Sequence, residues 1–112
     1  MLAESYTAVI ARGEDWTDGS ATEPYEASWA REAAISLRRL EAAPSSGAAS
    51  ARVQVSLDGL HWVDEGTVVA IPSEVDTVTL ARITGFPGYL RLVADMADGD
   101  TAFMLATLSL KG

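Results

Sequence analysis

Residues 52–63, RVQVSLDGLHWV, predict a β-hairpin and decide the fold class. Val53 and Val55 alternate with polar neighbours, as they do in a strand with one buried face. Asp58 and Gly59 follow as a tight-turn signal, because glycine readily adopts the positive φ that such turns need. The apolar residues after the turn continue the hairpin, so antiparallel pairing is expected here.

Similar short β-rich runs lie on both sides of this hairpin. They are predicted at residues 5–12, 67–71, 77–83, 89–94 and 101–110. Gly, Pro, Asp and Ser separate them, and strands at this close spacing are typical of sandwiches and barrels. The sequence therefore predicts an all-β protein, an antiparallel β-sandwich or jelly roll.

Residues 25–43 fit two patterns. Helical spacing aligns one set of apolar residues, and Ala, Arg, Glu and Leu favour helix. Strand spacing aligns Ala33, Ile35 and Leu37, and Ile35 does not fit the helical stripe. Because the rest of the chain reads as β, a strand is predicted, with Trp29 on its buried side.

The N-terminal strand and the loop after it carry aromatic residues. Tyr6, Ala8 and Ile10 are expected on one buried face of the strand at residues 5–12. Residues 13–23 read as a polar loop that contains Trp16. That side chain either covers one end of the core or contacts a partner.

The chain is predicted to form a single domain over residues 1–112. Its 112 residues suffice for a real core, since chains of this size bury roughly two thirds of their unfolded surface. Residues 44–50, PSSGAAS, are predicted to form a flexible turn that is too short for a domain linker. The chain has no Cys, which excludes disulfide scaffolds and zinc–thiolate sites.

Charge and hydropathy limit the partners and the location. The net charge of −8 opposes general binding to nucleic acid. No window approaches the ~20 apolar residues of a membrane span, and residues 1–6 do not resemble a secretory signal. A cytoplasmic protein, or one assembled there into something larger, is expected.

Catalytic signals are weak. The only His is His61, next to Trp62, and no Gly-x-Ser-x-Gly elbow accompanies it. The sequence also lacks a phosphate loop and a dinucleotide fingerprint. We expect a protein without enzymatic activity or cofactor.

Two groups of residues remain as candidate binding sites. Asp95, Asp98 and Asp100 crowd one predicted turn, where they either begin a calcium shell or simply form a soluble hairpin tip. The aromatic side chains either stack on a sugar or partner, or cover the core. They are Trp16, Trp29, Trp62, Tyr6, Tyr25 and Tyr89, of which Trp16, Trp62 and Tyr89 are the candidate contact residues.

The hairpin resembles part of a known family. The stretch Ser56-Leu57-Asp58-Gly59-Leu60-His61-Trp62, with the valines before it, resembles the Ser-x-Asp-Gly-x-x-Trp hairpin of discoidin-like (coagulation factor 5/8 C-type) galactose-binding β-sandwiches. Residues 89–93, YLRLV, and 107–112, TLSLKG, look like later strands of these domains. The resemblance implies the fold, and it assigns sugar or lipid binding to no particular residue.

A looser resemblance rests on size and architecture. A Cys-free jelly roll of this length looks like small virion proteins of tailed bacteriophages, such as capsid decoration or tail-associated subunits. This implies a structural protein of the virion, assembled in the host cytoplasm through contacts with its own copies or a larger lattice. The alternative is a carbohydrate-binding module of the galactose-binding-like type.

Overall fold

The computed structural model describes residues 5–42 and 48–112, which form eight β-strands. The strands are β1 (Ser5–Trp16), β2 (Tyr25–Glu26), β3 (Glu32–Arg39), β4 (Ser50–Ser56), β5 (Val63–Ala70), β6 (Val78–Thr84), β7 (Tyr89–Asp95) and β8 (Ala102–Lys111). Within the described residues, no helix has the length and apolar character needed to cross a membrane.

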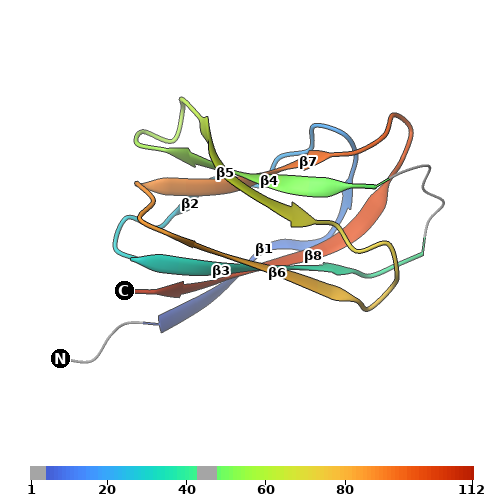
Figure 1. Ribbon diagram of the computed structural model, residues 1–112, viewed down its shortest axis with the longest axis horizontal. Helices are drawn as coiled ribbons and strands as arrows, with labels where there is room; N and C mark the ends of the chain where they lie inside the picture. The colour runs from blue at the N-terminus through green and yellow to red at the C-terminus, as the bar shows by residue number, and fades with distance from the viewer. Residues whose placement is uncertain (1–4, 43–47) are drawn as a thin grey trace.

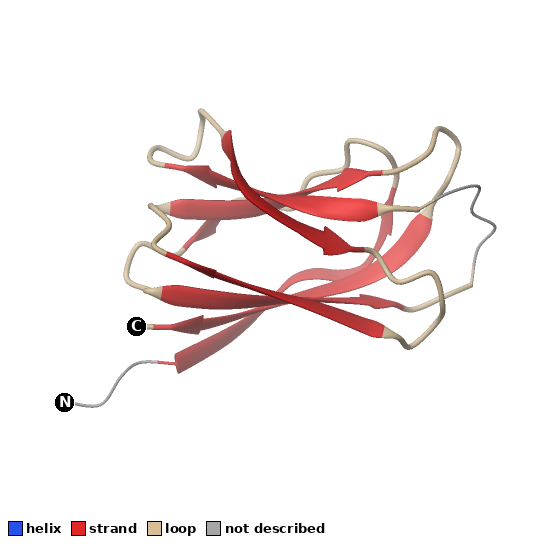
Figure 2. Ribbon diagram, in the orientation of Figure 1, coloured by secondary structure: helices blue, strands red, loops and turns tan. Residues whose placement is uncertain are grey.

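The strands form two four-stranded antiparallel sheets that stack face to face (Figures 1 and 2). The order is β1-β8-β3-β6 in the first sheet, sheet A, and β2-β7-β4-β5 in the second, sheet B. Four pairs are nested from the ends of the chain towards its middle: β1 with β8, β2 with β7, β3 with β6 and β4 with β5. The chain thus folds back on itself around the β4–β5 connection, and the predicted antiparallel β-sandwich is confirmed.

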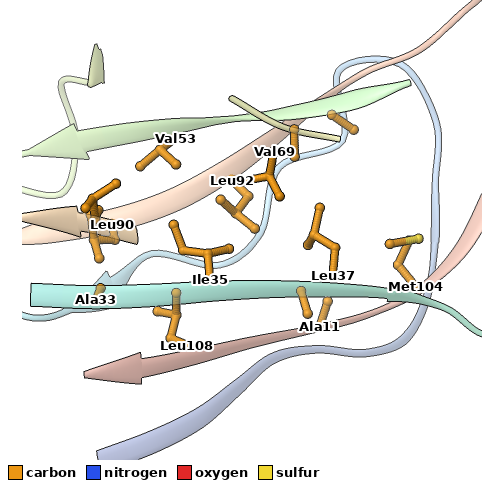
Figure 3. Close-up of a cluster of buried hydrophobic side chains, with 14 of the residues drawn as sticks. Ala11, Ala33, Ile35, Leu37, Val53, Val69, Leu90, Leu92, Met104 and Leu108 are labelled. Carbon is orange, nitrogen blue, oxygen red and sulfur yellow. The ribbon is translucent and has the colours of Figure 1, made fainter. Parts of the chain in front are cut away.

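The core lies between the sheets and is built by strict alternation. On β8, every second residue from Ala102 to Leu110 is buried, and the residues between them are half-buried. Ile35 and Leu37 on β3 extend this apolar layer and are fully buried. Side chains of sheet B, among them Val53 and Leu92, point towards them across the interface (Figure 3). The inward rows of both sheets thus meet in one apolar layer, as expected for stacked sheets.

β1 departs from simple alternation. Its register with β8 shifts twice, between Val9 and Ala11 and between Arg12 and Glu14. Each shift inserts an extra residue and reverses which side chains point inward. Tyr6 and Ala8 precede the first shift and pair with the buried Leu110 and Leu108, so they lie on the predicted inward face. Tyr6 is nevertheless exposed, because it lies at the beginning of this edge strand.

The buried residues of β1 are Ala11 and Trp16. Since β1 continues to Trp16, the predicted loop at residues 13–23 is wrong over its first four positions. Trp16 pairs with Ala102 and is 4% exposed. It belongs to the core, the first of the two roles considered for it.

The prediction of strand for residues 25–43 is confirmed in part. β2 and β3 form there and no helix does, but residues 27–31 connect them. Trp29 lies in this connection and is 37% exposed, so its expected place on a buried strand face is wrong. The turn predicted at residues 44–50 falls mostly outside the described residues.

The hairpin at residues 52–63 has a wider turn than predicted. β4 ends at Ser56 and β5 begins at Val63, so residues 57–62 form the connection. Trp62 therefore precedes the strand in which it was expected. Gly59 has the predicted positive φ of 78°.

The core predicts a large difference between two leucine truncations. We expect Leu37→Ala to lower the free energy of unfolding by about 2–5 kcal/mol, because it leaves a cavity between the sheets. Leu57→Ala, at a side chain that is 82% exposed, should lower it by less than about 1 kcal/mol. Urea denaturation of both variants measures the difference. Equal decreases in the free energy of unfolding would contradict a core that lies between the two sheets.

Candidate functional site

Large apolar side chains are exposed along one edge of the sandwich. β5 and β6 are the last strands of the two sheets and contact each other at this edge (Figure 1). Ten large hydrophobic residues of the described chain are exposed, and seven of them lie in or between the β4–β5 connection and β6. The β4–β5 connection packs against the beginning of β7, where a Cβ atom at Gly88 would lie 3.5 Å from Cα of Leu57. We therefore call the other five residues the apolar edge: Val63, Val68, Val75, Val78 and Leu80. Such a concentration is typical of an interaction surface.

β6 is the less protected of the two edge strands. Ile83 points into the core, so Val78 and Leu80 point outward on the opposite face, where Arg82 is the charged neighbour. β6 pairs with β3 on one side, and no other described strand pairs with its second side. Charges and bulges usually protect such edges. β5 has both, with Asp64 and a register shift opposite β4, whereas β6 pairs with β3 without a shift.

A second surface feature is an open pocket of about 590 Å³ where β1 begins and β2 lies. Among the described residues, its lining includes Ser5, Tyr6, Tyr25, Glu26 and Trp29. Tyr6 is 55% exposed, so two of the three aromatic rings, those of Tyr6 and Trp29, present much of their surface to solvent. We call this feature the aromatic pocket.

The polar groups of the aromatic pocket influence one another. The backbone N–H and the hydroxyl of Ser28 both donate to Oε1 of Glu26. These hydrogen bonds hold the pKa of Glu26 below its ordinary value, so the carboxylate stays ionised. Burial raises the pKa of Tyr25. The electrostatic effect of the Tyr6 phenol, the hydrogen bond between Tyr25 and Tyr6, and the charge of Glu26 act in the same direction. Tyr25 is therefore a neutral phenol that is hydrogen-bonded to Tyr6.

The Ser-x-Asp-Gly segment builds its own loop. Oγ of Ser56 accepts from the backbone N–H groups of Asp58 and Gly59, at 3.2 and 2.8 Å, and donates to Oδ1 of Asp58. That oxygen also accepts from the N–H groups of Leu60 and His61, at 2.8 and 2.9 Å. These side-chain-to-backbone bonds explain the motif locally.

His61 is part of the same loop. Its Nδ1 lies 2.7 Å from Oδ2 of Asp58, and its side chain is 88% exposed. Hydrogen bonds from the backbone and the ring of His61, then from Leu60 and Ser56, hold the pKa of Asp58 far below its ordinary value. His61 thus stabilises a surface loop.

The structure separates the three aromatic candidates for contact. Trp16 is in the core, as described above. Trp62 is half-buried, and the guanidinium of Arg91 covers its ring at 4.3 Å, a cation–π contact. Tyr89 is half-buried beside the loop, where a Cβ atom at Gly59 would lie 3.6 Å from its ring. Trp16 is thus apart from Trp62 and Tyr89, which both lie where the loop meets β7, and a contact role for either of these two stays a prediction.

The three carboxylates of the predicted acidic turn have different environments. Asp95 pairs with Arg52, with Nε and Oδ2 3.3 Å apart, whereas Asp98 is exposed and Asp100 is buried. Across residues 5–42 and 48–112, no group of three or more His, Asp or Glu side chains is placed to hold a metal ion. Gly99 supplies the positive φ of 84° in the turn that connects β7 and β8.

Sequence reasoning found neither surface as a unit. Tyr6, Tyr25 and Trp29 were recognised as aromatic residues that could stack, but they come from three separate segments. The apolar edge was missed because β6 alternates Val78 and Leu80 with Thr79 and Ala81, and either row could face the core. The only indication in the sequence was that both rows of side chains on this strand are apolar enough to face the core.

Comparisons with known proteins bear on the fold alone. No family model matches the chain, and no curated protein matches it in sequence. A solved structure is similar: a chain from the structure of infectious bursal disease virus, Gx strain, at a TM-score of 0.50 and 10% identity. The match covers 97% of this chain and 32% of that chain, so the present chain spans about a third of its neighbour's length. The virus chain therefore contains a similar β-sandwich.

The Asp58 network predicts an acid-dependent stability difference. A carboxylate whose pKa is lowered by folding adds stability above its unfolded pKa of about 3.9, and this stability is lost as the pH falls towards the folded value. Asp58→Asn should therefore unfold more easily than the wild type near neutral pH, and the difference should shrink below about pH 3.9. Urea denaturation across this range tests it. A difference that stays constant with pH would show that charge is not the cause.

Proposed function

We propose that this protein is a non-enzymatic structural protein that works by assembly, through contacts with its own copies or with a larger protein lattice. The observation that carries this proposal is the apolar edge, above all β6 with its open side and its outward Val78 and Leu80. An exposed edge strand of this kind pairs readily with another chain.

The topology supports a virion role. Two sheets ordered β1-β8-β3-β6 and β2-β7-β4-β5, with nested pairs, have the strand order of a jelly roll. This architecture occurs in capsid and lectin domains among others. The similar chain comes from a virus structure. We therefore favour a virion component, and specifically a bacteriophage capsid decoration or tail-associated subunit that is assembled in the host cytoplasm.

The charge distribution favours assembly at β6. Copies with a net charge of −8 repel one another, and this repulsion is smallest where the contact surface has few acids. β6 has no acidic residue and carries Arg82. Antiparallel pairing of two β6 strands would place Leu80 of one copy near Arg82 of the other, and a two-fold contact of this type is self-complementary.

The Ser-x-Asp-Gly motif does not support the alternative function, a carbohydrate-binding module of the galactose-binding-like type. Ser56, Asp58 and His61 satisfy one another and the loop backbone, and Arg91 covers Trp62. The structure of the loop therefore accounts for these motif residues, and no ligand is needed to explain them.

Assembly predicts a concentration-dependent oligomer. Size-exclusion chromatography with light scattering should show a dimer or larger species, because β6 gains hydrogen bonds and buries Leu80 when it pairs. Leu80→Lys should shift the protein to monomer, since a charge on an edge strand disfavours pairing.

Thr7→Lys is the matched control, since it adds the same charge to β1, the opposite edge strand of the same sheet. It should leave the oligomer intact. A wild-type protein that remains monomeric at every concentration would contradict self-assembly through β6.

A further inference from the structure

We infer that the aromatic pocket is a binding site for a neutral carbohydrate. This site is separate from the assembly surface: β1 and β2 lie at one edge of the sandwich, and β5 and β6 lie at the other. It involves none of the residues of the Ser-x-Asp-Gly motif.

The exposed rings supply the apolar contact. Tyr6 is 55% and Trp29 is 37% exposed, although burial of large aromatic side chains normally contributes much to a core. The ring of a neutral sugar has an apolar C–H face that packs on such surfaces. The two rings belong to the lining of one open pocket of about 590 Å³.

Directional polar groups surround these rings. The phenolic groups of Tyr6 and Tyr25 hydrogen-bond each other, which leaves one phenolic proton to donate to a ligand, and the Glu26 carboxylate accepts. Both hydrogen bonds from Ser28 use Oε1 of Glu26, so Oε2 is the oxygen available to a ligand. An ionised carboxylate accepts strong hydrogen bonds, as sugar hydroxyls would provide. A few oriented polar groups beside aromatic surfaces are what sugar recognition requires.

The backbone holds Trp29 in place. The N–H of Ala27 donates to Gly88 O at 2.8 Å, and the N–H of Ala30 donates to Ala27 O at 3.0 Å. The last residue packs against the indole, since a Cβ atom at Gly112 would lie 3.3 Å from Cε3 of Trp29. A ring that is fixed before binding loses little entropy when a ligand arrives.

Charge selects the class of sugar. Among the described residues, the pocket lining includes one carboxylate, that of Glu26, and no Lys or Arg. The hydrogen bonds from Ser28 keep this carboxylate ionised. Uronic acids, sulfated sugars and phosphates are therefore repelled, and neutral glycans are favoured.

Titration with defined oligosaccharides tests the site. The probes are neutral oligomers of β-1,4-glucose, β-1,4-N-acetylglucosamine, α-1,4-glucose and β-1,4-galactose, with oligogalacturonate as the acidic probe. We expect at least one neutral oligomer to bind, with a Kd of about 0.01–1 mM, measured by calorimetry and by the change in tryptophan fluorescence. Oligogalacturonate should not bind.

Variants connect the binding to the pocket. Tyr6→Ala and Trp29→Ala should each raise the Kd by about tenfold or more, while Val9→Ala, at an exposed apolar position outside the lining, should leave it unchanged. Glu26→Gln should retain the neutral oligomer and admit oligogalacturonate. Tyr6 is largely exposed, so its variant stays informative if Trp29→Ala fails to fold.

Three outcomes would overturn the inference. They are the absence of binding to every neutral oligomer, binding that Tyr6→Ala leaves unchanged, and wild-type protein that prefers the acidic oligomer. Binding of a peptide library at the pocket without any glycan would assign the site to a protein partner and would equally reject it.

Discussion

The burial of two facing apolar rows between the sheets is the constraint on which the rest of the structure depends. The central strands β8 and β3 of sheet A face β7 and β4 of sheet B, and their inward side chains are almost completely enclosed. Central strands have a neighbour on each side and a sheet in front of them, so their backbone and one face are fully used. Edge strands lack one of these neighbours. Surfaces free for recognition therefore arise at the edges, where the apolar edge and the aromatic pocket both lie.

Much of the fold could be predicted because most strands alternate cleanly. β4, β7 and β8 begin and end within about two residues of the predicted runs, since their buried residues recur with period two. β1 could not be predicted in this way. Its two register shifts depend on pairing with β8, which is distant in sequence, and between them the inward position passes to Ala11. Local alternation carries no information about such shifts.

The candidate sites show the same limit. Ser56, Asp58 and Gly59 are close in sequence, so the sequence predicts their role in a turn. It does not predict the width of the loop. The aromatic pocket combines β1 from one sheet, β2 from the other and the connection after β2. Only the stacking of the sheets brings Tyr6 and Trp29 together. A motif that is contiguous in sequence here builds structure, whereas the proposed site is assembled from separated single residues.

The positions of the two surfaces make their roles compatible. In sheet A, β8 and β3 separate β1 from β6, and in sheet B, β7 and β4 separate β2 from β5. Pairing through β6 would therefore leave the aromatic pocket open on every copy. A shallow site that binds one sugar weakly gains strength when several copies engage one glycan surface, because later contacts form at a high effective concentration. Assembly at one edge would then convert weak recognition at the other edge into firm attachment, without any change in the pocket itself.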